Sequence, residues 1–218
     1  MRAFKFMVVD LLKCRLQVIF MILFTGLALL FMVRSKNPFS GMFYMSFAGV
    51  IIGIQPFMQE QSSEVGFLYM LPGTKNTRVA GRYLYGLLLQ ALAIFLSLAA
   101  TSMFRIISGR QTEGIWAGAL LCFSVGLIFS ALQNILFYAL GKMKSQQMAG
   151  IVMMIPGFIM FFGINFALEY GIESLNSYME WVKIHPGAFY GTMAAASLAV
   201  WCAGIVISAW IIKGRDDI

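Results

Sequence analysis

Residues 115–140 read IWAGALLCFSVGLIFSALQNILFYAL and carry no charged side chain. A helix needs about 20 mainly apolar residues to cross a hydrocarbon core about 30 Å thick, so this stretch is long enough to span a membrane. In lipid, every backbone N–H and C=O must be hydrogen-bonded within a helix or a closed barrel. Barrel strands alternate in polarity, whereas apolar runs such as IFMILF at residues 19–24 do not. The sequence therefore predicts transmembrane helices.

Five further stretches have the same character. Together with residues 115–140 they give six predicted spans, at 16–33, 39–58, 83–104, 115–140, 148–168 and 189–212. All 25 charged residues, 16 Lys or Arg and 9 Asp or Glu, lie outside these spans. The chain is 60% hydrophobic and 11% charged, whereas soluble domains are about 25% charged. We expect an all-α integral membrane protein with a single transmembrane domain over residues 1–218, and a soluble enzyme is excluded.

Two features within the spans bear on helix shape and packing. Pro56 lies near the end of the second span, where we expect it to cost little, and Pro156 lies inside the fifth, where we expect a kink. Small residues recur at four-residue spacing, which allows helices to approach closely. These pairs are Gly49 and Gly53, Gly114 and Gly118, Ala199 and Ala203, and Gly204 and Ser208.

The distribution of Lys and Arg predicts the orientation of the chain. With the N-terminus in the cytoplasm, the inner segments contain eleven of these 16 residues and the outer loops contain five. Because cytoplasmic loops are enriched in Lys and Arg, we expect both termini in the cytoplasm. The net charge of +7 follows from this topology. No soluble segment has a basic run with interleaved aromatic residues, so nucleic acid is not an expected partner, whereas membrane lipid is.

The sequence carries no motif for catalysis or metal binding. The spans contain no charged residue and no His, whereas proton-coupled carriers place ionisable side chains there. The chain has one His, so it has no pair of His ligands, and Gly141-Lys142 is followed by Met143 rather than the Ser or Thr of a P-loop. Its three cysteines form no disulfide or metal pattern. We expect no catalytic residue, no metal and no cofactor in this chain.

Two segments outside the spans are predicted to form helices at the membrane surface. Apolar residues recur at helical spacing in residues 1–15, at Phe4, Met7, Val8, Leu11 and Leu12. This pattern predicts an amphipathic interfacial helix on the inner leaflet, or alternatively an extension of the first span into the headgroups. In residues 169–186 one helix face holds Ile172, Leu175, Met179 and Val182. That face predicts a short outer-leaflet helix before the last span.

The longest predicted cytoplasmic loop, residues 59–82, reads QEQSSEVGFLYMLPGTKNTRVAGR. Its acidic start suits the N-terminus of a short helix, because the helix dipole favours acidic side chains there. Pro72 and Gly73 form a turn, and Thr74 is placed to cap a second helix from about Lys75 into the third span. The apolar ridge before the turn is framed by charges, which predicts a docking element for another protein. The alternative is a loop that folds back on the bilayer surface.

Three short motifs in this loop carry a family resemblance. They are EVG at residues 64–66, LPGTK at residues 71–75 and RVAGRYL at residues 78–84. The loop resembles that of permease subunits of type-2 ATP-binding-cassette (ABC) exporters. In those subunits an acidic residue is followed by Leu-Pro-x-Ser/Thr-Arg/Lys and then by Val-x-Gly/Ala-Lys/Arg-Tyr at the third span. Gly73 departs from the branched residue that many relatives carry.

The resemblance implies a cytoplasmic coupling helix over about residues 59–70, seated in a cleft of a separate ABC ATPase subunit. Glu60 and Glu64 are then the expected polar contacts. The full set of expected ATPase-coupling residues is Glu60, Glu64, Gly66, Leu68, Leu71, Pro72, Thr74, Arg78, Arg82, Lys142 and Lys144. ATP and Mg²⁺ would be bound by the partner ATPase. Two permeases, either two copies of this chain or this chain and a paralogue, would pair with two ATPases.

The short single-domain form also resembles bacterial plasma-membrane exporters of amphipathic peptides, such as the phenol-soluble-modulin exporters. A neutral interior rich in Phe and Met would suit such cargo. The expected substrate path contains Phe47, Gln55, Gln90, Asn134 and Asn165. The alternative functions are a non-transport assembly or sensor subunit that docks a different cytoplasmic partner, and a passive channel, which the absence of a charged ring in the spans disfavours.

Overall fold

The computed structural model describes residues 2–59, 74–109, 114–140 and 184–214, which are almost entirely helical, with no strand among them. The helices are α1 (Arg2–Lys13), α2 (Arg15–Ser35), α3 (Pro38–Gly53), α4 (Gln55–Gln59), α6 (Lys75–Ser108), the helix Ile115–Leu140 and α9 (Pro186–Lys213). The all-α prediction is confirmed for these parts of the chain.

Five helical segments are long and apolar enough to cross a membrane. They are Arg15–Ser35, Pro38–Phe57, Lys75–Ser108, Ile115–Leu140 and Pro186–Lys213. Each overlaps one predicted span, so five of the six predictions are confirmed as helices of sufficient length and apolarity. The predicted span at 148–168 and the predicted helix within 169–186 lie outside the described residues.

The second predicted span is divided at Ile54. α3 ends at Gly53 and α4 begins at Gln55, so the expected continuous helix over residues 39–58 is replaced by two. The physical reason is Pro56, which has no N–H and whose ring clashes with the carbonyl of Ile52, four residues earlier. The backbone N–H of Phe57 instead donates to the Ile54 carbonyl at 3.0 Å, which forms a tighter turn.

The N-terminal segment forms a helix of its own. α1 ends at Lys13 and α2 begins at Arg15, and Cys14 between them has a non-helical backbone. Backbone hydrogen bonds still run from Cys14 to Asp10 and from Val18 to Cys14, so the two helices meet at a bend rather than a loop. α1 therefore does not simply continue α2, and its position on the inner leaflet stays a prediction.

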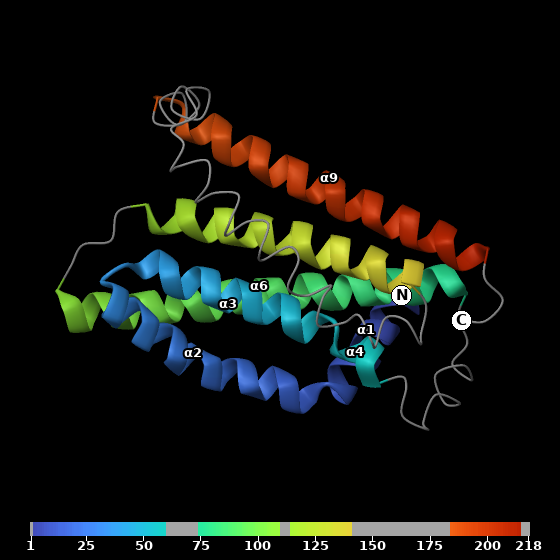
Figure 1. The fold of residues 1–218 in the computed structure, drawn as a ribbon, viewed down its shortest axis with the longest axis horizontal. Helices are drawn as coiled ribbons and strands as arrows, with labels where there is room; N and C mark the ends of the chain where they lie inside the picture. The colour runs from blue at the N-terminus through green and yellow to red at the C-terminus, as the bar shows by residue number, and fades with distance from the viewer. Residues whose placement is uncertain (1, 60–73, 110–113, 141–183, 215–218) are drawn as a thin grey trace.

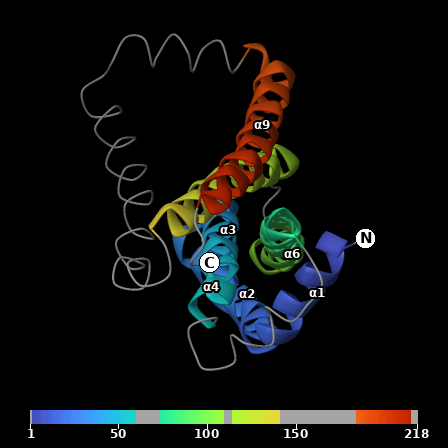
Figure 2. The same ribbon diagram turned by 90° about the vertical axis from the view of Figure 1, so that its right-hand side faces the viewer.

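α6 is the central helix of the bundle and contacts α1, α2, α3 and α9. Seen end-on, α1 and α3 lie on opposite sides of α6, with α2 below them (Figure 2). α1, α4, the first turns of α6 and the last turns of α9 and of the Ile115–Leu140 helix lie at one end (Figure 1). We call this end the α1 end; the α2–α3 turn and the last turns of α6 lie at the opposite end.

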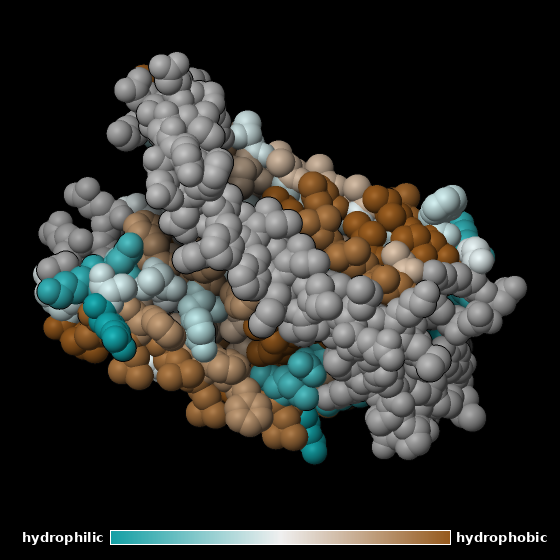
Figure 3. Space-filling model, in the orientation of Figure 1, coloured by the Kyte–Doolittle hydropathy of each residue, from teal (hydrophilic) through white to brown (hydrophobic). Residues whose placement is uncertain are grey.

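The outer surface of α2 is suited to lipid. α2 buries Met21, Ala28 and Met32 toward the bundle and exposes large apolar side chains on its other face, including Leu16, Leu23 and Leu30. Figure 3 shows hydrophobic residues over the visible faces of α2 and α9, with hydrophilic residues toward the helix ends. Extended apolar surface of this kind is unfavourable in water and costs nothing in hydrocarbon, which agrees with a multi-pass membrane protein.

Candidate functional site

The candidate site lies at the α1 end, where α6 begins. The Thr74 side chain accepts a hydrogen bond from the backbone N–H of Thr77 at 3.4 Å and caps the first turn of α6. Thr74 has an extended backbone and the helix starts at Lys75, as the sequence predicted. This cap fixes the residue at which the chain enters α6, and so fixes which side chains of its first turns point toward each neighbouring helix.

Arg82 is the central side chain of this site. Its Nε lies 3.9 Å from Oδ2 of Asp10 in α1, and the two side chains are only 11% and 6% exposed. Its guanidinium carbon lies 4.0 Å from the centre of the Phe57 ring in α4. A cation against an aromatic face is stabilised most strongly when water is excluded. Arg82 therefore connects three elements, α1, α4 and α6, within a largely dry environment.

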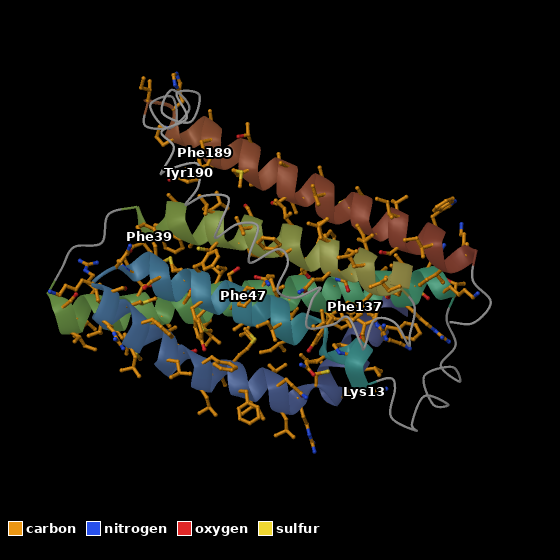
Figure 4. The ribbon with its side chains drawn as sticks, in the orientation of Figure 1. Lys13, Phe39, Phe47, Phe137, Phe189 and Tyr190 are labelled. Atoms are coloured by element: carbon orange, nitrogen blue, oxygen red, sulfur yellow. The ribbon has the colours of Figure 1, made fainter. Side chains whose placement is uncertain are left out.

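Phe57 extends this connection to a fourth element. Its ring stacks on Phe137 with centroids 5.1 Å apart and forms a T-shaped pair with Tyr138, with centroids 5.0 Å apart. Both partners belong to the Ile115–Leu140 helix, and Figure 4 shows Phe137 toward the α1 end of that helix. We call Asp10, Phe57, Arg82, Phe137 and Tyr138 the Arg82 junction.

α1 lies in direct contact with the first turns of α6. Arg78 places its guanidinium carbon 5.9 Å from the centre of the Phe6 ring. A methyl group added at Gly81 would stand 2.6 Å from Cβ of Phe6 and 2.9 Å from the carbonyl oxygen of Ala3. Only glycine allows α1 to come this close, because any Cβ would collide with it.

Cys14 is buried beside the Arg82 junction, at the bend between α1 and α2. Its side chain packs in a core cluster with Met21, Tyr85 and Leu89. Burial raises the pKa of the Cys14 thiol to about 11, and the nearby Asp10 carboxylate also raises it. The thiol is therefore protonated at neutral pH and fills space as a small apolar group.

Tyr83 joins α6 to α9. Its hydroxyl lies 2.9 Å from the Ser208 hydroxyl in α9, and it donates to the Ala131 carbonyl in the Ile115–Leu140 helix at 3.4 Å. A methyl group added at Gly204 would stand 2.9 Å from the Tyr83 hydroxyl oxygen. The pair of small residues Gly204 and Ser208 therefore makes the predicted close approach, whereas Ala199 and Ala203 are exposed.

A second polar contact lies deeper in the bundle. The Ser46 hydroxyl of α3 donates to the Cys122 carbonyl at 2.8 Å and to Oε1 of Gln90 at 3.2 Å. Gln90 in α6 is fully buried and donates in turn to the Ser46 carbonyl at 3.2 Å. These bonds tie α3, α6 and the Ile115–Leu140 helix together, so Gln90 is engaged in helix packing.

The other expected substrate-path residues lie in separate places. Asn134 is buried and donates to the Ser130 carbonyl in its own helix at 2.9 Å. Phe47 is half-buried on α3, farther from the α1 end than Phe137 (Figure 4), and Gln55 is half-buried in α4. The hydrogen bonds of Gln90 and Asn134 go to different partners, so none of those described joins the two into one site.

Most of the expected ATPase-coupling residues fall on parts of the chain that are not described. These are Glu60, Glu64, Gly66, Leu68, Leu71, Pro72, Lys142 and Lys144, and Asn165 of the expected substrate path joins them. The described members are Thr74, Arg78 and Arg82, and the structure brings all three into the first turns of α6.

Sequence reasoning did not single out Asp10 or Phe57. One signal for Asp10 was present, because Phe6, Asp10 and Cys14 follow each other at four-residue spacing and so share one helix face. All three are buried. Phe57 had no such signal, since its role depends on the turn at Ile54. In the described parts of the chain, no group of three or more His, Cys, Asp or Glu side chains could hold a metal ion.

The comparisons with known proteins agree with this architecture. The family model described as "ABC-2 family transporter protein" matches residues 7–213, which is nearly the whole chain. No curated protein and no solved structure matches the chain. The matched region begins in α1 and ends at the last residue of α9, so it contains all five apolar helices and the Arg82 junction. The chain therefore belongs to the ABC-2 family of transporter proteins, as a multi-pass membrane permease.

Proposed function

We propose that this chain is the membrane-spanning subunit of an ATP-driven exporter. Membership of the ABC-2 family implies pairing with a cytoplasmic ATPase subunit, which would bind ATP and Mg²⁺. The observation that carries the proposal is the packed start of α6, where Arg82 connects α1, α4 and α6 beside the segment expected to meet the ATPase. A transport subunit driven by a separate motor needs such a connection between its docking segment and its helices.

The proposed ATPase contact is the α1 end of the bundle. α4 leads into the expected coupling helix at about residues 59–70, with Glu60 and Glu64 as its polar contacts. Leu140 leads into Lys142 and Lys144, which would make a second contact. α4, the start of α6 and the end of the Ile115–Leu140 helix share this end (Figure 1), which supports one docking surface for both loops.

The charges of the described helices support a cytoplasmic α1 end. At that end are Arg2, Lys5, Lys13, Arg15, Lys75, Arg78, Arg82 and Lys213, and at the other end are Arg34, Lys36 and Arg105. Eight basic residues against three agrees with the enrichment of Lys and Arg in cytoplasmic segments. Both termini would then be cytoplasmic.

The proposed cargo is an amphipathic peptide, and its proposed path passes Phe47, Gln55 and Asn134, with Asn165 as a further member. Among the described residues, the buried side-chain oxygens Oδ1 of Asn134 and Oε1 of Gln133 have no hydrogen-bond partner. Buried acceptors without partners are costly, so a passing peptide that donates N–H groups would be favoured there. The neutrality of the path suits cargo that carries its own charge on one face only.

The proposal is tested by purifying the chain from membranes that hold its natural partners and reconstituting the complex in lipid vesicles. We expect a P-loop ATPase to co-purify with the chain, and Glu64→Arg to reduce ATP hydrolysis by the complex about tenfold or more. Lys36→Glu, a charge reversal of an exposed residue at the opposite end, is the matched control and should leave hydrolysis unchanged. A stable, homogeneous chain that binds no ATPase would refute the proposal.

A further inference from the structure

We infer that Asp10 and Phe57 are positioning residues that pass movement of the ATPase-facing segment into the bundle, through Arg82 to α1 and through Phe137 and Tyr138 to the Ile115–Leu140 helix. This inference rests on the proposed function, because it assumes that an ATPase acts on the chain beyond α4. It adds to that function a route and two positioning residues, Asp10 and Phe57. The route is made of described contacts only.

The first step of the argument is the position of Phe57. α4 is the last described element before residues 60–73, and Phe57 lies in its middle. A displacement of residues 60–73 can therefore reach the bundle along the chain through α4, on the other side of the segment from the start of α6. Because the helix is interrupted at Ile54, α4 is able to move without bending the whole of α3.

The second step is the environment of Arg82. Its guanidinium group is held between a carboxylate of α1 and an aromatic ring of α4, with little water around any of them. Breaking a buried ion pair on one side leaves an uncompensated charge in a low-dielectric environment. If Phe57 shifts, the lowest-energy response is therefore for Arg82 and Asp10 to shift with it, because both contacts of the guanidinium group are then kept.

The third step is that the route divides at Phe57. One branch runs through Arg82 and Asp10 into α1, which continues across the Cys14 bend into α2. The other runs through the stacked ring of Phe137 and the T-shaped contact with Tyr138 into the Ile115–Leu140 helix. These two groups of helices lie on different sides of α6 (Figure 2), so one input would move both sides of the bundle.

The test uses the permease–ATPase complex in lipid vesicles with three variants, Asp10→Asn, Phe57→Leu and Arg82→Lys. We expect the Asp10→Asn and Phe57→Leu complexes to co-purify as the wild type does and to keep basal ATP hydrolysis within about twofold. The probe is a synthetic amphipathic α-helical peptide. Hydrolysis stimulated by this peptide, and its transport, should fall about tenfold for both variants. Arg82→Lys keeps the charge and should retain more transport than either. Phe43→Leu, at an exposed ring on α3, is the matched control and should have no effect.

A double-variant comparison separates a shared route from independent structural damage. Because movement reaches Asp10 only after Phe57 on the branch through Arg82, combining Asp10→Asn with Phe57→Leu should reduce transport no further than the worse single variant. Additive losses, or loss of basal hydrolysis or of ATPase binding in the single variants, would overturn the inference. Unchanged transport in all three single variants would also overturn the inference, but it would not contradict the proposed function. If the wild-type chain binds no ATPase, the proposed function itself fails before any variant is measured.

Discussion

Gly81 determines how closely α1 can approach α6. Its hydrogen faces Phe6 and the carbonyl of Ala3, and a side chain of any size would meet both. The same turn of α6 carries Arg82, so the distance set at Gly81 also determines whether Asp10 can reach the guanidinium group. The absence of a side chain at Gly81 thus allows the neighbouring Arg82 to contact Asp10.

We expect Gly81→Ala to destabilise the protein by about 1–3 kcal/mol, the usual cost of overpacking a tight contact. The reason is that the new Cβ would lie 2.6 Å from Cβ of Phe6. The measurement is the thermal midpoint of the purified protein in detergent. Gly26→Ala is the control, since nothing lies within 4 Å of a Cβ there and alanine favours a helix interior. Equal midpoints for the two variants would contradict the close approach of α1.

At the scale of elements, α9 packs against the bundle through a small number of buried residues. α9 buries Ser197, Gly204, Ser208 and Ile212, and most of its remaining surface is exposed. The Tyr83 hydroxyl provides the polar part of this contact by meeting Ser208 and the Ala131 carbonyl. In a membrane, where burial of apolar surface gives no driving force, such polar and close-packed contacts hold helices together.

Tyr83→Phe and Ser208→Ala should each lower stability by about 0.5–1.5 kcal/mol, the range found for hydrogen bonds between membrane helices. Both changes remove the Tyr83–Ser208 bond, and Tyr83→Phe also removes the bond to the Ala131 carbonyl, so the double variant should lose little more than Tyr83→Phe alone. Thermal midpoints in detergent give the comparison. Fully additive losses would show that the two hydroxyls do not interact.

The elements differ in how far the sequence could predict them. The spans were predictable because each is an uncharged apolar run, and the Thr74 cap was predictable because it depends only on residues within the same turn. The divided second span was missed, since a proline near a span end can be tolerated or can break the helix. The partners of Arg82 could not be predicted, because they depend on which helices meet rather than on local sequence.

At the scale of the whole molecule, most of the basic residues and the Arg82 junction lie at the same end of the bundle. The basic residues of the described helices gather at the α1 end, and so do the Arg82 junction and the helix ends that lead into the expected ATPase-binding loops. The opposite end holds the α2–α3 turn, closed by the Asn37 side chain accepting from the Phe39 N–H at 3.0 Å. The permease is therefore polarised along its long axis.

This polarity predicts the orientation in the membrane. In a cysteine-free background, Arg34→Cys at the far end should react in intact cells with a thiol reagent that cannot cross membranes. Asn76→Cys at the α1 end should react only after the cells are opened. Both native residues are exposed on the protein surface, so the side of the membrane on which each cysteine lies decides whether it is labelled. Labelling of Asn76→Cys in intact cells would reverse the proposed orientation.

The length of α6 has a mechanical consequence. Its 34 residues, at a rise of 1.5 Å each, make a rod about 51 Å long, whereas the hydrocarbon core is about 30 Å thick. About two-fifths of α6 therefore lies outside the hydrocarbon core, and the Arg82 junction contacts α6 near its N-terminal end. A rod pivoting within the bilayer swings its two tips in opposite directions. A pull that draws α6 inward at the α1 end would then swing it outward at Gly109, so the two ends of α6 would move in opposite directions relative to the helices around it.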